Sequence, residues 1–179
     1  MGLAEIERQD FPPPAQGVLQ ACPEGFRIVN AFPREAALPS YLSGDPESRA
    51  VRVSYFYRDS DRFLKANAWL GPGAKGPPAH AHGGAMAALL DESMGVCAWQ
   101  AGIPVLAAKI EITYRRSLPL GSVVLVEAWI ERIEGRKLWL ASRLLGADGE
   151  LYSEGTGLFL ELNDAQKAAF EVYREENPV

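Results

Sequence analysis

One stretch of the sequence, residues 79–102 (AHAHGGAMAALLDESMGVCAWQAG), constrains the fold more than any other. At 100° per residue a helix places one carboxylate, that of Asp91, on a narrow stripe whose other members are all glycine or alanine. The opposite side carries large apolar residues, so the helix is expected at the centre of a domain. The stripe, which leaves room for a second backbone or a slender ligand, consists of Gly84, Ala87, Ala88, Asp91, Gly95 and Ala98.

The distance between His82 and Asp91 indicates how this helix is used. The two residues are nine positions apart, which is about 13 Å along a straight helix and half a turn around it. One helix therefore cannot bring both to the same reacting atom. Two antiparallel copies related by a two-fold axis would place the start of one beside the middle of the other. The spacing predicts a homodimer with two equivalent sites.

Length and charge narrow the class of protein. The 179 residues suit one domain with an additional arm. A net charge of −5 without any basic block argues against a nucleic-acid binder, so an anionic ligand must be held by local cations. No apolar run is long enough for a membrane span, and the first residues do not form a secretory signal. With only Cys22 and Cys97, the chain is expected to be reduced and cytoplasmic.

The order of the remaining segments predicts the fold class. Residues 1–50 are rich in proline without sustained periodicity, and we expect an irregular arm with one short helix packed on a domain of residues 51–179. That domain begins with a hairpin at 51–70, and after the long helix four strand-like segments and a final polar helix follow. We expect an α+β domain in which an antiparallel sheet, with these four strands in meander order, curls around the central helix. The four segments span residues 105–116, 122–134, 136–146 and 150–162.

Several motifs resemble known sites but lack an essential part. Residues 71–76 match G-x-G-x-x-G, but two prolines follow and no parallel crossover is visible, so a loop is expected. His80 and His82 have no third partner for a metal ion. HGGA occurs without the serine of a G-x-S-x-G hydrolase. Cys97 lies on the large-apolar side of the helix and is expected in the core rather than as a nucleophile.

The start of the helix carries the stronger chemical signal. No Ser, Thr, Asp or Asn precedes Gly83 and Gly84, so their N–H groups are expected to be free at the positive end of the helix dipole. Such donors stabilise a carbonyl oxygen as it becomes an oxyanion. Asp91 of a second protomer would act as a general base on water or attack directly. The alternative is that the two glycines permit tight packing and Asp91 is a structural hydrogen-bonding group.

The segment HGGAMAALLDESMG resembles the helix motif of the hotdog-fold acyl-CoA thioesterases, in the branch of the phenylacetate-pathway enzymes. The similarity continues through KIEITYRRSLPLGSVVLVEAWIERIEGRKLWLASRLLGADGELYSEGTGLFLEL and covers about residues 50–162. The chain is similar in particular to the subfamily of the mitochondrial long-chain acyl-CoA thioesterases. The resemblance implies a hotdog-fold dimer, which in relatives often pairs further into a dimer of dimers. The implied activity is the hydrolysis of an acyl-CoA thioester without a metal or redox cofactor.

The resemblance also implies roles for particular residues. Asp91 takes the place of the family's catalytic carboxylate, and the N–H of Gly83, with Gly84 beside it, falls where relatives polarise the thioester carbonyl. His82 matches the motif histidine that shapes this end of the helix. Four residues match positions that contact coenzyme A in relatives: Thr113, Arg115, Arg136 and Lys137.

One departure from the family pattern concerns a hydroxyl. Relatives usually carry Thr or Ser sixteen to eighteen residues after the acid, where this chain has Ala107, Ala108 and Lys109. Ser93 is the nearest substitute within the helix. The missing hydroxyl keeps open a non-catalytic acyl-CoA-binding hotdog protein as an alternative. A hotdog hydratase or dehydratase ranks third, because the chain has only two histidines.

Overall fold

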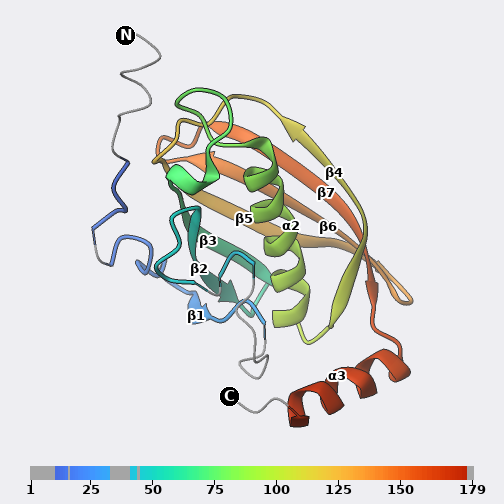
Figure 1. The fold of residues 1–179 in the computed structure, drawn as a ribbon. Helices are drawn as coiled ribbons and strands as arrows, with labels where there is room; N and C mark the ends of the chain where they lie inside the picture. The colour runs from blue at the N-terminus through green and yellow to red at the C-terminus, as the bar shows by residue number, and fades with distance from the viewer. Residues whose placement is uncertain (1–10, 16, 33–40, 44, 177–179) are drawn as a thin grey trace.

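A seven-stranded antiparallel sheet curves around helix α2 (Gly83–Gln100) in the computed structural model, which describes residues 11–15, 17–32, 41–43 and 45–176 (Figure 1). This confirms the predicted curved sheet and long central helix. The short helix η1 (Pro72–Ala74) precedes α2, and α3 (Asp164–Glu176) follows the sheet. The strands are β1 (Arg27–Val29), β2 (Val51–Arg58), β3 (Phe63–Leu70), β4 (Val105–Tyr114), β5 (Val123–Glu134), β6 (Lys137–Gly146) and β7 (Leu151–Glu161).

The strand order corrects one expectation. The order is β1-β2-β3-β5-β6-β7-β4, so β5, β6 and β7 form a meander but β4 does not join it next to β5. Helix α2 crosses the face of the sheet, and the chain emerges from it at the far edge, where Val105 pairs with Glu161 of β7. The free edge of β3 is taken by β5 instead. Strand β4 is therefore an outer edge of the sheet.

Helix α2 is buried on the side that the sequence predicted. Leu89, Leu90, Val96 and Cys97 have no exposed surface, and Met86 almost none. Burial raises the pKa of the Cys97 thiol to about 12, which fits the predicted core position better than a nucleophile. The last two members of the small-residue stripe, Gly95 and Ala98, are buried. Its first four members stay at least partly exposed: Gly84, Ala87, Ala88 and Asp91.

The described part of the arm contains a strand rather than the short helix that the sequence led us to expect. Strand β1 pairs with β2 at the edge of the sheet opposite β4. Arg27 of β1 forms an ion pair with Asp59 at 2.9 Å. Asn67 of β3 donates hydrogen bonds to the carbonyls of Leu19 and Ala21, both at 3.3 Å. These contacts fix the arm against β2 and β3.

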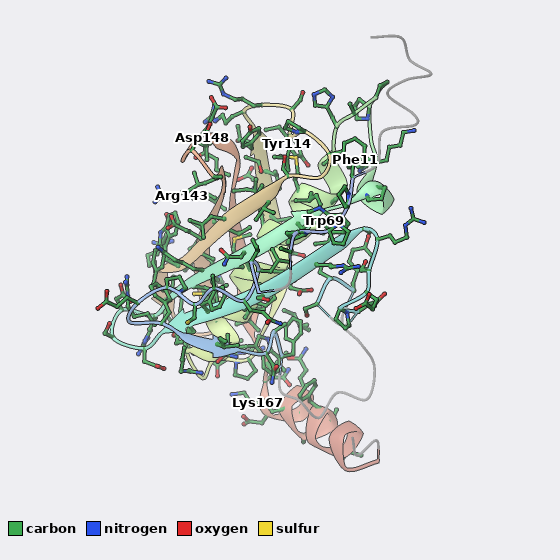
Figure 2. The ribbon with its side chains drawn as sticks, turned by 90° about the vertical axis from the view of Figure 1, so that its left-hand side faces the viewer. Phe11, Trp69, Tyr114, Arg143, Asp148 and Lys167 are labelled. Carbon is green, nitrogen blue, oxygen red and sulfur yellow. The ribbon has the colours of Figure 1, made fainter. Side chains whose placement is uncertain are left out.

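The two ends of the molecule differ in what they carry. Figure 2 shows Tyr114 and Asp148 toward one end, here called the upper end, and Lys167 of α3 at the other, the lower end. Helix α2 begins at the upper end and finishes at the lower end, where Trp99 contacts Phe170 of α3 with ring centroids 5.3 Å apart. Asn163 caps α3, because its Oδ1 accepts a hydrogen bond from the Gln166 N–H at 2.8 Å. No helix in the described ranges has the length and apolar character needed to cross a bilayer.

Candidate active site

The loop before α2 is packed tightly against the start of the helix. The His82 N–H donates to the Ala74 carbonyl at 2.7 Å, and the Gly76 N–H donates to the His80 carbonyl at 2.9 Å. A Cβ atom at Gly76 would lie only 2.7 Å from the His82 Cα, so this position requires glycine. The glycines of residues 71–76 thus belong to a loop that fixes the helix start, in agreement with the sequence prediction.

The first turn of α2 corrects the prediction for Gly84. His82 is the N-cap residue, in an extended conformation, and its Nδ1 accepts a hydrogen bond from the Gly84 N–H at 2.9 Å. The Gly84 N–H is therefore not free, because an imidazole nitrogen performs the capping that Ser or Asp usually performs. An accepting Nδ1 leaves the ring proton on Nε2. A Cβ atom at Gly84 would lie 2.8 Å from this nitrogen, which explains the second glycine.

The Gly83 N–H remains as the available donor. It donates to no acceptor in the described part of the chain, whereas the Gly83 carbonyl accepts a hydrogen bond from the Tyr114 hydroxyl at 2.9 Å. Tyr114, at the end of β4, thereby joins the edge strand to the helix start. Sequence reasoning did not assign a role to Tyr114.

The carboxylate of Asp91 is half-buried and forms no hydrogen bond or ion pair with any residue that the structure describes. Burial raises its pKa above the ordinary range of aspartate. The adjacent Glu92 differs, because it accepts a hydrogen bond from the Tyr55 hydroxyl at 2.8 Å. Asp91 lies eight residues from Gly83, about 12 Å along the helix axis, so the two cannot act on one atom within a protomer.

The register of β4 indicates which of this chain's residues occupies the position where relatives usually carry the hydroxyl of Thr or Ser. Ala107 pairs with Phe159, whose side chain is buried, so Ala107 points to the helix-facing side of the sheet. Ala108 lies in the irregularity between Ala107 and Lys109. Ser93 is fully buried and about 200° around the helix from Asp91, so it cannot serve as the substitute.

Two of the predicted coenzyme A contacts lie at the upper end, near Gly83. Thr113 precedes Tyr114 and is exposed, opposite Glu154 of β7. Arg115 is also exposed, and its Nε donates to Glu154 Oε1 at 2.8 Å. The structure thus groups these two residues with the start of α2.

The other two predicted contacts lie at the lower end, in the turn between β5 and β6. Arg136 donates to the Glu161 carbonyl from Nε at 3.0 Å and from Nη2 at 2.7 Å, which secures the end of β7. Lys137 is exposed and has no ion-pair partner among the described residues. The length of β4, about 30 Å, separates these residues from Gly83 in the same protomer.

The edge strand β4 is unusually exposed for a strand of ten residues. Only Val105 at its start is buried, while Leu106 is 58% and Tyr114 51% exposed. An edge of this length presents a row of unpaired backbone N–H and C=O groups, which proteins usually cover or pair. The partly exposed stripe of α2 opens to solvent as well.

Comparisons with known proteins agree with this architecture. A family model described as the thioesterase superfamily matches residues 79–151. The chain is 41% identical over 100 residues to acyl-coenzyme A thioesterase THEM4 of Bos taurus, covering 55% of this chain and 40% of that protein. It is 33% identical over 119 residues to the THEM4 protein of Xenopus laevis, covering 66% and 54%. The chain therefore spans about half the length of these relatives.

Solved structures share the fold. A thioesterase superfamily protein is 30% identical with a TM-score of 0.58, over 62% of this chain and 54% of that chain. A thioesterase protein of Streptococcus pneumoniae with coenzyme A is 14% identical with a TM-score of 0.55, over 56% and 79%. Two variants of a thioesterase protein from the same organism, Asp to Ala and Thr to Ala at positions sixteen residues apart, match with TM-scores of 0.56 and 0.58. They are 12% and 13% identical, over 80% and 71% of this chain and 96% and 100% of those chains.

Proposed function

Because residues 79–151 match the family model of the thioesterase superfamily, we propose that this protein is an acyl-CoA thioesterase that acts as a homodimer. The observation that carries the proposal is a pair of groups on α2 that have no hydrogen-bond partner in the described part of the chain: the Gly83 N–H and the half-buried Asp91 carboxylate. A donor for an oxyanion and a carboxylate of raised pKa are the two parts that acyl transfer to water needs.

The dimer is proposed from the exposed edge of β4. Two copies of β4 pairing antiparallel across a two-fold axis would satisfy the free edge and continue the sheet. The same axis would set the two α2 helices antiparallel along their partly exposed stripes. Asp91 of one protomer would then face Gly83 of its partner, which removes the separation of about 12 Å within one chain.

In this arrangement the thioester carbonyl oxygen lies at the Gly83 N–H, where the helix dipole adds to the attraction. Asp91 of the partner takes a proton from water, whose oxygen forms a bond to the acyl carbon. The tetrahedral intermediate collapses with cleavage of the C–S bond, and the proton goes to the departing sulfur. The products are the free acid and CoA-SH. Direct attack by Asp91 on the carbonyl would use the same placement.

Antiparallel pairing would also account for the position of the predicted coenzyme A contacts at two opposite ends of one protomer. Arg115 lies near Gly83 of its own protomer, and the two-fold axis would bring the lower end of the partner, with Lys137, toward this region. Local cations are needed for a ligand with several phosphates, because the chain as a whole has a charge of −5. Arg136 has a structural task at the end of β7, so we assign the larger share of phosphate binding to Lys137.

We expect Lys137→Ala to raise KM for acyl-CoA about three- to tenfold and to change kcat less than twofold. The reason is that an exposed lysine contributes to ground-state binding of phosphate rather than to the reacting centre. Steady-state kinetics at low and high salt measure this effect, which salt should weaken. Lys65→Ala on β3 is the matched control and should leave KM unchanged. An unaltered KM for Lys137→Ala removes this residue from the binding site.

A second candidate function is an acyl-CoA-binding protein without catalysis, and Ala107 is the observation that favours it. Ala107 faces the helix side of β4 sixteen residues after Asp91, where relatives usually carry a hydroxyl. The same spacing separates the two positions altered in the pneumococcal variants. Thiol release from acyl-CoA distinguishes the two functions, since the binder would gain thermal stability from acyl-CoA without releasing CoA-SH.

We expect Ala107→Thr to raise kcat about tenfold. The hydroxyl would hold the attacking water or the Asp91 carboxylate, and the β-branched side chain suits an exposed strand position. Ala108→Thr, in the irregularity of the same strand, is the control and should give no gain. A fall in kcat, or an equal gain in both variants, would show that water is held by other groups.

The experiment that tests the proposed function is thiol release from a panel of short, long and aromatic acyl-CoAs by the wild-type protein and by Asp91→Asn. Release by the wild type that vanishes in the variant supports the thioesterase. Release that is equal in both proteins refutes the assigned site.

A further inference from the structure

A cavity of about 380 Å³ opens beside the first two turns of α2. The helix contributes Gly84, Ala85 and Ala88, whose side chains add at most one methyl group each. His82 also borders the cavity. Residues on both sides of Gly83 therefore line it, so it adjoins the N–H group to which we assign the thioester carbonyl.

The walls opposite the helix come from segments outside the thioesterase domain match. The loop around η1 supplies one of them, and the end of the arm with the start of β2 supplies the other. The arm and the start of β2 lie more than thirty residues before α2, whereas the η1 loop directly precedes it, and the fold brings both segments together at the helix start (Figure 1). They contribute Tyr41, Leu42, Ser48, Ala50, Val51, Gly73, Ala74 and Lys75.

The deep surface of the cavity is apolar. Leu42, Val51 and Ala74 are buried, and among the described residues that line the cavity no charged side chain is buried. The Ser48 hydroxyl oxygen accepts a hydrogen bond from the Ala50 N–H at 3.1 Å, so it is already used by the backbone. Lys75 is exposed and therefore stands at the opening rather than in the depth. An uncharged, apolar group fits this lining.

The volume limits what the cavity accepts. At about 30 Å³ per non-hydrogen atom, the share of one water molecule in the liquid, 380 Å³ holds about a dozen atoms. An acyl group of about eight carbons or a phenylacetyl group fits within this limit. A sixteen-carbon chain exceeds it, and the buried Leu42 and Val51 close the way onward.

We propose, on the basis of the thioesterase function above, that this cavity receives the acyl group and that Leu42 of the arm, with Val51 of β2, forms its end. The enzyme then prefers short and medium acyl groups, linear or phenyl-substituted, over long chains. The arm, for which the sequence indicated no task, is the element that sets the acyl-chain limit.

The test is kcat/KM for saturated acyl-CoAs of two to sixteen carbons and for phenylacetyl-CoA. For the wild type we expect a maximum near six to eight carbons and a value at least 100-fold lower at sixteen. Ala88→Leu narrows the cavity by three carbon atoms, and at about fourfold per excluded methylene it should lower octanoyl-CoA turnover 10- to 60-fold. Acetyl-CoA turnover should fall at least threefold less than octanoyl-CoA turnover.

Two further variants sharpen the test. Leu42→Ala shortens a side chain of the opposite wall and so enlarges the cavity. It should lengthen the longest accepted acyl chain by about three carbons, whereas Ala88→Leu should shorten it. Ala168→Leu on the exposed side of α3 is the matched control and should keep the wild-type profile. Melting temperatures show which variants are folded. If Leu42→Ala is unfolded, the chain-length profile of Ala88→Leu alone tests the proposal.

Two results would overturn the proposal: a wild-type maximum at sixteen carbons, or a loss for acetyl-CoA in Ala88→Leu as large as that for octanoyl-CoA. If no thioester is hydrolysed at all, the proposed function fails separately. Calorimetric titration with octanoyl-CoA and with CoA then tests whether the cavity binds the acyl group. Tighter binding of octanoyl-CoA that Ala88→Leu abolishes supports the acyl site, and equal affinities overturn it.

Discussion

Asp91→Asn is expected to lower kcat for acyl-CoA hydrolysis at least about 1,000-fold and to raise the melting temperature. General-base catalysis contributes about 10²–10⁴ to a rate, and the amide cannot accept the proton from water. The stability gain has a different origin, because the half-buried carboxylate has no partner in the described part of the chain to compensate its desolvation. Thiol-release kinetics and thermal unfolding on the same preparation measure both effects.

The pH dependence follows from the direction of the pKa shift. Burial raises the pKa of Asp91 in the folded protein above its unfolded value of about 3.9. Ionised Asp91 therefore destabilises the fold fully above the folded pKa, and the penalty disappears as the pH falls below the unfolded pKa. The gain from Asp91→Asn should be full at pH values above the folded pKa and vanish near pH 3. In the wild type, kcat/KM should fall on the acid side with a midpoint above 4.

Glu92→Gln is the matched control for this prediction. It removes the same charge from the next residue and retains an oxygen that accepts the Tyr55 hydroxyl. Its kcat should stay within about threefold of the wild-type value. Equal losses in Asp91→Asn and Glu92→Gln would indicate a general effect of helix charge and would contradict the assignment of Asp91.

Gly83→Pro is expected to lower kcat about 100- to 1,000-fold with little change in helix content. Proline removes the N–H that we assign to the oxyanion, and a single such donor contributes about this factor. The backbone tolerates the change, because Gly83 is the first helical residue and His82 already has the extended conformation required before proline. Kinetics together with far-ultraviolet circular dichroism check both parts of the prediction.

Gly83→Ala separates loss of the N–H from the new side-chain contact. A Cβ atom at this position would lie 3.3 Å from the Tyr114 ring in either variant. Alanine keeps the N–H, so its effect on kcat measures that contact alone and should be at least tenfold smaller than the effect of proline. Similar losses in both variants would attribute the change to Tyr114 and not to the donor.

The sequence was sufficient for the central helix because its pattern is local. Apolar residues on one side and glycine or alanine on the other predicted the buried side of the helix, where Leu89 and Leu90 lie, and a stripe with room for a second backbone or a ligand, on which Asp91 is half-buried. The edge position of β4 was not predicted, since the alternation along a strand does not tell which neighbour it pairs with. The pairing of β4 depends on where α2 ends relative to the sheet, and that position is determined by the whole fold.

At the start of α2, too, the sequence predicted some features, and others became apparent only in the folded chain. The sequence located Gly83 and Gly84 but treated their N–H groups as equivalent, since histidine is not among the usual capping residues. Only the three-dimensional position of the His82 ring reveals that one of the two donors is used. Likewise, the family spacing left three positions open for the missing hydroxyl, and the register with β7 singles out Ala107. The cavity that Leu42 and Val51 help to line had no sequence signal, because its walls meet only in the folded chain.

The central claim is that each site combines Gly83 of one protomer with Asp91 of its partner. Co-expression of Asp91→Asn and Gly83→Pro with different affinity tags allows the heterodimer to be purified and its thiol release measured. One of its two sites would contain both intact groups, so we predict about half of the wild-type activity from two nearly inactive parents. A heterodimer as inactive as its parents, or a wild-type chain that sediments only as a monomer, would contradict the shared site.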